Sequence, residues 1–132
     1  MHIVLCLDDK NGLLFNHRRI SFDRAVCSRI YERHSGKLMM THYSVKIFPD
    51  MEVVADDLFL HNAETGDTCF VEDLAFVDYL TSVESITVYR WNRQYPSDTR
   101  LPQQLLEEWK KIQTTDFAGS SHEIITEEVY VR

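Results

Sequence analysis

The chain has 132 residues, a formal net charge of −7 at pH 7, and hydrophobic and charged shares of 44% and 27%. This length favours one domain with its own core, and apolar residues spread along the whole chain exclude a disordered protein. The acidic balance argues against non-specific nucleic-acid binding, and no apolar run approaches the roughly 20 residues that a membrane-spanning helix needs.

The cysteines and the amino-terminal residues indicate a compartment. Cys6, Cys27 and Cys69 are widely spaced and form neither a C-x-x-C pair nor a zinc-binding pattern. Cys6 and Cys69 lie in apolar runs, so we expect buried free thiols, which fit a reducing cytosol. The first residues enter a strand-like run directly and lack the pattern of a signal peptide. We therefore expect a cytoplasmic protein.

The first third of the chain predicts a strand, a loop and a helix. Residues 3–7 form a short apolar segment that is followed by a turn-forming run, and this pattern is typical of a buried strand. Residues 13–20 are expected to form a loop. Ser21 is the expected N-cap of the helix, with Asp23 in its first turn, where the helix dipole favours a negative charge. Ser35-Gly36 would end this helix.

The remaining residues alternate between short strands and helical segments and then end in strands. Strands are expected at 37–40, 52–55, 68–71, 84–91, 109–115 and 123–131, and helical segments at 41–48, 56–63 and 73–80. This alternation is typical of an α/β sheet that is mostly parallel, and the last two strands predict an antiparallel C-terminal hairpin. One domain over residues 1–132 follows.

These residues, in this order, resemble dihydrofolate reductase over nearly the whole chain, in a shortened form. The opening I-V-L-C-L-D-D-K-N-G is similar to that enzyme's first strand and the loop after it. Residues 89–102 resemble its strand and G-D-T-x-F-P turn, with Ser97 and Leu101 in place of Gly and Phe, and Trp109 and the last strands continue the match. The resemblance implies a three-layer fold with a reduced lobe for the cofactor's adenosine.

The chain is also similar to a group of small bacterial proteins with the motifs F-N-x-R-R-x-S-x-D-R, W-N-R-x-Y-P-S-D and G-S-S-H-x-x-I-T. The three motifs lie here at 15–24, 91–98 and 119–126. Such proteins often carry the label ribonuclease Z, an enzyme that needs an H-x-H-x-D-H cluster for two zinc ions. The six histidines of this chain include no H-x-H pair. We therefore expect no metal site and no metal-dependent ribonuclease activity.

The resemblance places the NADPH phosphates at a G-R-x-T/S stretch and at a later Gly-Gly pair. Here the first stretch reads Thr41-His42-Tyr43-Ser44, in which only Ser44 fits, so the phosphate-pairing Arg is missing. The second reads Val71-Glu72-Asp73, and two carboxylates would repel a pyrophosphate. We therefore expect no NADPH and no other cofactor.

Asp23 falls at the position of the family's proton-donating carboxylate and is the candidate catalytic residue. The resemblance implies that it could hold the edge of a pteridine ring through two hydrogen bonds. The family's threonine partner corresponds to the larger Tyr89, so the pocket would differ in shape. An aspartate in a first helical turn is equally well explained as a partner of the helix dipole.

The candidate ligand-binding residues are polar groups expected around the same pocket: Arg18, Arg19, Asn92, Arg93, Ser121 and His122. The arginines could form paired hydrogen bonds to a carboxylate or phosphate, and His122 could titrate near neutral pH. Alternatively, Arg19 and Arg93 pair with Asp23 and Asp98 as structural ion pairs.

Ser120-Ser121-His122 places hydroxyls beside an imidazole. Neighbours on a strand face opposite ways, so a Ser121–His122 dyad is not expected. Ser120 and His122 would share a face, but the sequence identifies no acid that could orient the ring.

Three functions stay open. The favoured one is a small-ligand-binding protein that takes a planar or anionic ligand and has no NADPH chemistry. The second is a divergent oxidoreductase acting on a pterin, flavin or nucleotide-like substrate. The third is a dimeric interaction module, in which a second copy covers the sheet edge that a shortened lobe would expose.

Overall fold

The computed structural model describes every residue except Ser35. Its strands are β1 His2–Leu7, β2 Gly12–Phe15, β3 Arg18–Arg19, β4 Leu38–Met40, β5 Val54–Ala55, β6 Thr68–Phe70, β7 Ser85–Arg90, β8 Thr99–Arg100, β9 Lys110–Phe117 and β10 Ile125–Val131. Its helices are α1 Arg24–Arg33, α2 His42–Val45, α3 Phe59–Asn62, the 3₁₀ helix η1 Ala75–Ser82, and α4 Gln103–Glu107.

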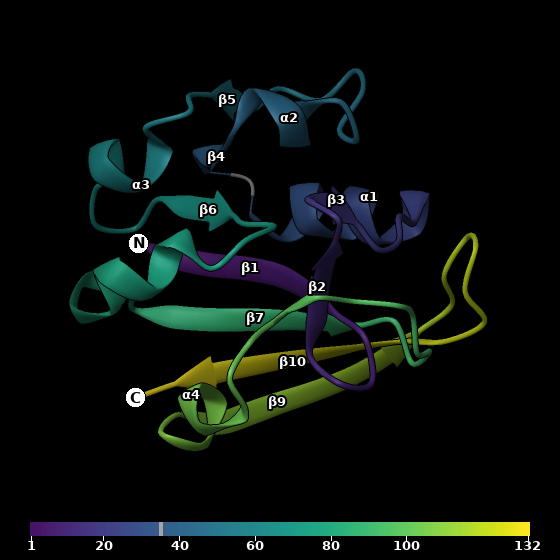
Figure 1. Cartoon of the computed structure of the whole chain (residues 1–132). Helices are drawn as coiled ribbons and strands as arrows, with labels where there is room; N and C mark the ends of the chain where they lie inside the picture. Colours follow the sequence, from purple (N-terminus) through teal and green to yellow (C-terminus); the bar gives the residue numbers. More distant parts are fainter. Residues whose placement is uncertain (35) are drawn as a thin grey trace.

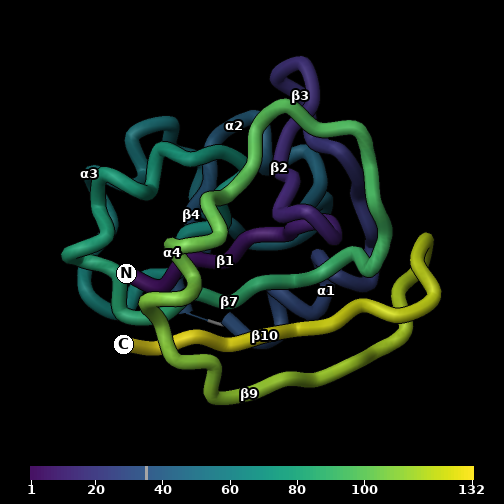
Figure 2. The backbone as a smooth tube through the Cα atoms, turned by 60° about the horizontal axis from the view of Figure 1, so that its bottom comes forward, coloured from purple at the N-terminus to yellow at the C-terminus, as the bar shows by residue number. Residues whose placement is uncertain are grey.

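Seven strands form one twisted sheet in the order β5-β4-β6-β1-β7-β10-β9 (Figure 1). The pairs from β5 to β7 are parallel, and β10 is antiparallel to both β7 and β9. Figure 2 shows β9 as the outermost strand. The predicted mostly parallel sheet with an antiparallel C-terminal hairpin is therefore confirmed.

Alternating residues of the buried strands divide the interior into two cores. Ile3, Leu5 and Leu7 of β1 pack on one face of the sheet with residues from α3, η1 and α4. Val4 lies in the core on the other face, which includes residues of α1. This alternation is the two-residue period of a strand, and it places helices on both faces of the sheet in three layers.

Residues 13–20, predicted as a loop, instead form the hairpin of β2 and β3. Asn16 and His17 both have positive φ angles, 51° and 62°, as a two-residue hairpin turn requires. β2 also pairs with β8, which the sequence did not predict. β8 lies far from β2 in the chain, so no local sequence pattern could predict this pairing.

The first helix begins two residues later than predicted. Its N-cap is Asp23, whose backbone is extended and whose side chain accepts from the N–H groups of Ala25 and Val26. The prediction of Ser21 as N-cap was wrong, because the Ser21 side chain faces another segment. The helix ends at Arg33 with His34 as its C-cap. The predicted stop at Ser35-Gly36 includes Ser35, which lies outside the described residues.

Other helices and strands also differ from their predicted positions or types. Glu123 and Ile124, predicted within the last strand, precede β10, and the helix at residues 103–107 was not predicted. The segment predicted as a helix at 73–80 is a 3₁₀ helix.

The three cysteines are free, but Cys6 is half-buried, not buried as expected, because it lies at the margin of the core that includes residues of α1. No helix in the described part of the chain is long and apolar enough to cross a bilayer.

Candidate functional site

The carboxylate of Asp23 is fully buried at the start of α1. Its Oδ1 accepts hydrogen bonds from the backbone N–H groups of Ala25 at 2.9 Å and Val26 at 3.2 Å. These two groups belong to the first helical turn, whose N–H donors have no partner inside the helix. Asp23 therefore begins α1 by satisfying them.

The same carboxylate also holds the loop between β9 and β10. Ser120 N–H donates to Oδ1 at 3.0 Å, and Ser121 N–H donates to Oδ2 at 2.9 Å. The Nδ1 atom of His122 lies 2.9 Å from Oδ2. All five of these contacts come from the protein itself, so the acceptor positions of Asp23 are occupied.

Gly119 permits this close approach of the loop. A Cβ atom at this position would lie 2.6 Å from Asp23 Oδ2 and 2.7 Å from the carbonyl oxygen of His122. Both separations are far shorter than a van der Waals contact, so a side chain at this position would push the loop off the carboxylate. Glycine is therefore required here by space, not by backbone angle.

The surroundings of Asp23 decide its protonation state. Burial by itself raises the pKa of this carboxyl, but hydrogen bonds from Ser120, His122, Ser121 and Val26 outweigh burial and lower it to about 2. Asp23 is therefore ionised at neutral pH and can only accept hydrogen bonds. The proton between it and His122 accordingly belongs to Nδ1 of the ring.

The other ring nitrogen of His122 faces two hydroxyl groups. Nε2 lies 2.8 Å from the Tyr95 hydroxyl and 3.0 Å from Ser21 Oγ, and the two hydroxyls are 3.1 Å apart. In the neutral ring Nε2 carries the lone pair, so it accepts from one of these hydroxyls. Trp91 stacks on the ring, with centroids 4.6 Å apart and 19° between the planes. His122 is thus held on both edges and one face.

The sequence identified no acid that could orient His122, but the structure supplies one. Asp23 is that acid, contributed by a segment 99 residues earlier. Ser120 and His122 lie in a loop, not on a strand face as expected. The two hydroxyls that reach the ring belong to Tyr95 and to Ser21, and the sequence marked Ser21 only as a helix cap. The spacing of Ser21 and Asp23 could have indicated that both side chains lie on one side of the chain, because alternate residues of an extended segment point the same way.

Four of the predicted ligand-binding residues meet at one hollow of about 430 Å³. It lies between the segment after β7 and the β9–β10 loop and is lined by Trp91, Asn92, Arg93, Ser121, His122, Glu123 and Ile124. Asn92 joins the two walls, because its Nδ2 donates to the Ile124 carbonyl at 3.1 Å and to Thr126 Oγ1 at 2.9 Å. Arg93 is exposed, and its guanidinium lies 5.8 Å from the Tyr95 ring centroid.

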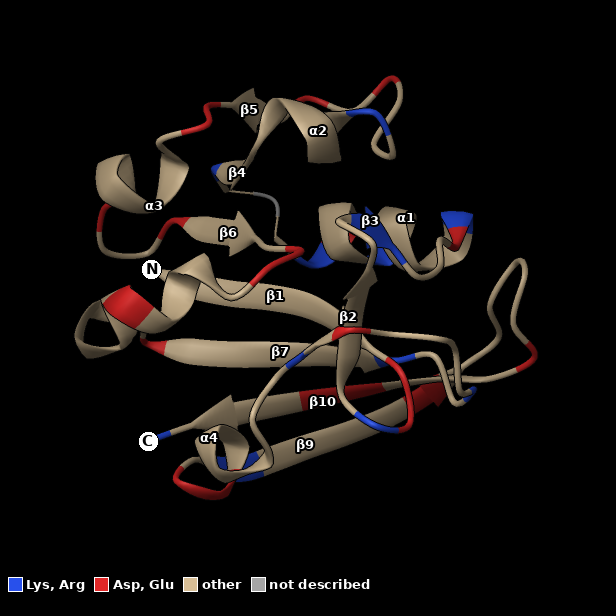
Figure 3. Ribbon diagram, viewed as in Figure 1, with Lys and Arg blue, Asp and Glu red and all other residues tan. Residues whose placement is uncertain are grey.

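Arg18 and Arg19 lie elsewhere. Arg18 is exposed on β3 and is not among the residues lining that hollow. Arg19 makes a two-pronged ion pair with Glu72, at 2.8 and 2.9 Å, and its guanidinium lies 4.2 Å from the Tyr43 ring centroid. In Figure 3 the acidic segment after β6 lies beside the basic β3. The suggested pairing of Arg19 with Asp23 is therefore wrong, since Glu72 takes this guanidinium.

The suggested pairing of Arg93 with Asp98 does not form either. Asp98 accepts from the Asn16 N–H at 2.9 Å and so closes the β2–β3 turn. Among the described residues, no carboxylate lies within ion-pair distance of Arg93. Its charge is thus available to a ligand.

The residues that correspond to an NADPH phosphate site are engaged with one another. Ser44 Oγ donates to Glu72 Oε2 at 2.7 Å, and Arg19 pairs with both oxygens of the same carboxylate. Ser44 and Glu72 line a second hollow, of about 420 Å³, with the further carboxylates of Asp57 and Asp73. A pyrophosphate would have to displace the Glu72 carboxylate from both partners. These residues do not fit that group.

The recess beside Asp23 is small. Its volume of about 20 Å³ holds roughly one water molecule, and its walls include Cys6, Ile20, Phe22 and Val26. A bicyclic pteridine ring needs far more room. A catalytic role for Asp23 stays a prediction, as does the reduced adenosine lobe.

No protein-family model and no curated protein sequence matches the chain. Among solved structures, the chain is similar to dihydrofolate reductase from Enterococcus faecalis complexed with NADP(H) and RAB-propyl, with a TM-score of 0.64 and 11% sequence identity. The match covers 99% of this chain and 96% of that chain. The predicted dihydrofolate-reductase-like α/β fold is therefore confirmed. At this identity the likeness concerns the fold alone.

Proposed function

We propose that this protein binds a small ligand with a planar part and one anionic group, in the hollow beside Trp91, and that it works without NADPH chemistry. The observation that carries this proposal is the unpaired guanidinium of Arg93 at a hollow of about 430 Å³. Other arginines, such as Arg18 and Arg24, also lack a carboxylate partner among the described residues, but Arg93 is the one that lines this hollow and can meet an anion bound there.

The other walls of the hollow indicate the ligand's chemistry. Ser121 offers an exposed hydroxyl, and Ile124, which is 47% exposed, offers apolar surface for a planar group, while Trp91 is buried in the wall with its ring stacked on His122. Glu123 also lines the hollow, and its carboxylate disfavours a ligand with several negative charges. A planar monoanion matches this combination better than a polyphosphate does.

The hollow of about 420 Å³ that is lined by Ser44, Asp57, Glu72 and Asp73, here called the acidic cleft, supports the part of the proposal that excludes NADPH chemistry. Glu72 is held by Arg19 and Ser44, so the groups that could grip a phosphate are already paired. Binding of NADPH would cost these hydrogen bonds and would bring a polyanion against Asp57 and Asp73. A divergent NADPH-dependent reductase is therefore the less favoured function.

The test is a titration followed by tryptophan fluorescence and thermal shift. The probes are benzoate and nicotinate as planar monoanions, with NADPH and dihydrofolate as the competing hypothesis. We expect a planar monoanion to bind saturably, and Arg93→Ala to weaken it about tenfold or more, because hydrogen bonds to charged groups contribute about 1.5–3 kcal/mol. Arg24→Ala, which removes an exposed arginine on α1, is the matched control and should bind normally.

Two results would count against the proposal. Saturable binding of NADPH would show that the acidic cleft opens, and a reductase assay would follow. Equal affinity in wild type and Arg93→Ala would remove the anion site from this hollow.

A further inference from the structure

Three side chains form a hydrogen-bonded line at the start of α1: the Asp23 carboxylate, the His122 imidazole and the Ser21 hydroxyl. The distances along it are 2.9 Å from Oδ2 to Nδ1 and 3.0 Å from Nε2 to Oγ. Asp23 is fully buried, His122 is 6% exposed, and Ser21 is partly exposed. The line thus begins in the interior and ends at the surface, with the hydroxyl at its outer end.

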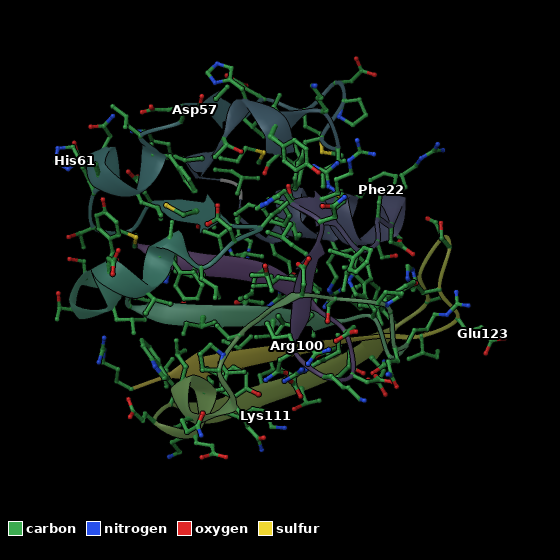
Figure 4. All side chains as sticks on the ribbon, in the orientation of Figure 1. Phe22, Asp57, His61, Arg100, Lys111 and Glu123 are labelled. Carbon is green, nitrogen blue, oxygen red and sulfur yellow. The ribbon has the colours of Figure 1, made fainter. Side chains whose placement is uncertain are left out.

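The backbone explains this geometry. Asp23, the residue directly before α1, has an extended backbone, with φ −148° and ψ 123°. In an extended segment residues 21 and 23 point to the same side and residue 22 points to the other. Phe22, labelled in Figure 4, is accordingly 40% exposed. The β9–β10 loop then places the His122 ring against both Ser21 and Asp23.

Each member of the line has the chemistry that nucleophilic catalysis needs. The ionised Asp23 fixes the proton on Nδ1 and leaves the lone pair of Nε2 facing the hydroxyls. A serine hydroxyl is a weak nucleophile until a base takes its proton, and an imidazole oriented by a carboxylate is the usual base. The arrangement is recognised by its geometry and roles, not by the order of its residues in the chain.

We propose that Ser21 is a nucleophile, with His122 as its general base and Asp23 as the positioning residue, and that it takes a short acyl group from a carboxylic ester. This activity goes beyond ligand binding at Arg93 and does not rest on it. The acyl group is short because the recess lined by Ser21 has a volume of only about 20 Å³ and largely apolar walls. That space suits a methyl group and excludes a long chain.

The step balances without a cofactor. Ser21 Oγ forms a bond to the ester carbonyl carbon while its proton moves to His122 Nε2. The bond to the alcohol oxygen then breaks, and the alcohol leaves with that proton. Water, deprotonated by Nε2, releases the carboxylic acid and restores Ser21. The Tyr95 hydroxyl, 3.1 Å from Ser21 Oγ, can donate to the oxyanion that forms between these steps.

The same contacts also hold the β9–β10 loop on α1, and this structural role alone would give no reactive serine. Covalent labelling separates the two. Wild-type protein is treated with a fluorophosphonate, which phosphonylates activated serines, and separately with p-nitrophenyl acetate. Trypsin then releases residues 20–24, a peptide whose only hydroxyl-bearing side chain is Ser21.

We expect the fluorophosphonate on this peptide, and a burst of nitrophenolate of about one per chain that places an acetyl group there. Ser21→Ala should abolish both. His122→Gln should lower the labelling rate at least a hundredfold, in line with the 10²–10⁴-fold that a positioned base contributes. Ser28→Ala is the matched control, because Ser28 is another partly exposed serine on α1, and it should react like wild type.

Circular dichroism and melting temperature accompany each variant, and Ser21→Ala keeps the His122–Asp23 contact, so it should remain folded. The proposal is overturned if natively folded wild type leaves Ser21 unlabelled. It is equally overturned if Ser21 in folded His122→Gln reacts as fast as in wild type, or if Ser21 reacts no faster than Ser28.

Discussion

His122 donates its Nδ1–H to the buried carboxylate of Asp23 across 2.9 Å, although the two residues are 99 positions apart in the chain. The contact joins the start of α1 to the β9–β10 loop. It also orients the imidazole toward Ser21 and places His122 at the wall of the hollow that contains Arg93. The stability of this region and its chemistry therefore depend on the same carboxylate.

Replacement of Asp23 by alanine should destabilise the protein strongly. The change removes the N-cap of α1, which contributes about 1 kcal/mol, and leaves the N–H groups of Ser120 and Ser121 without their charged acceptor. We expect the free energy of unfolding to fall by about 3 kcal/mol or more in urea. Asp9→Ala, which removes an exposed carboxylate, should change it by less than about 0.5 kcal/mol. Similar losses in the two variants would contradict the role given to Asp23.

The pH dependence of stability should carry the signature of Asp23. Its folded pKa is about 2, and an unfolded aspartate titrates near 3.9. Stabilisation from a lowered pKa is fully present above the unfolded value and is lost as pH falls toward the folded one. Between pH 5 and 2, wild type should therefore lose about 2 kcal/mol more than Asp23→Asn.

The measurement is urea unfolding at a series of pH values in both proteins. Other carboxyls with lowered pKa values, such as Glu127 and Glu128, titrate in both proteins and cancel in the difference. Parallel stability curves would mean that the Asp23 carboxylate is not held by these hydrogen bonds.

Gly119→Ala should separate the β9–β10 loop from α1. The added Cβ would lie 2.6 Å from Asp23 Oδ2, so the loop must move and the hydrogen bonds to the carboxylate lengthen. We expect a loss of about 2–4 kcal/mol in unfolding free energy, typical of strain combined with broken buried hydrogen bonds. Gly36→Ala is the matched control, because a Cβ there meets no atom within 4 Å. If both variants melt at the wild-type temperature, the close approach of the loop is wrong.

The Arg19–Glu72 pair should contribute measurable coupling. Its side chains are 21% and 14% exposed and meet in a two-pronged geometry, so solvent screens them only partly. A double-mutant cycle with Arg19→Ala and Glu72→Ala should give about 1–2 kcal/mol. The control cycle uses His42 and Asp57, both 69% exposed, and should give less than about 0.5 kcal/mol. Equal couplings would show that partial burial and the two-pronged geometry give the Arg19–Glu72 pair no advantage over an exposed pair.

The sequence by itself determined the central strands of the sheet and their α/β arrangement. Residues 3–7 are a continuous apolar run of strand length, and residues 84–91 alternate between polar and apolar side chains, and both patterns are typical of strands. Short strands that alternate with helical segments then permit few arrangements other than a parallel α/β sheet. The β2–β3 hairpin was missed because its turn depends on positive φ angles at Asn16 and His17, neither of which is glycine.

Only the tertiary structure decided which groups meet. The sequence named Asp23, Ser121 and His122 as candidates, but not that the first accepts hydrogen bonds from the other two. It placed Arg19 and Glu72 at different sites, and folding joined them into one ion pair. Local patterns record the period of a strand or helix, whereas contacts between distant segments depend on how the elements pack. A side chain's partner, and therefore its charge and its chemistry, is set by that packing.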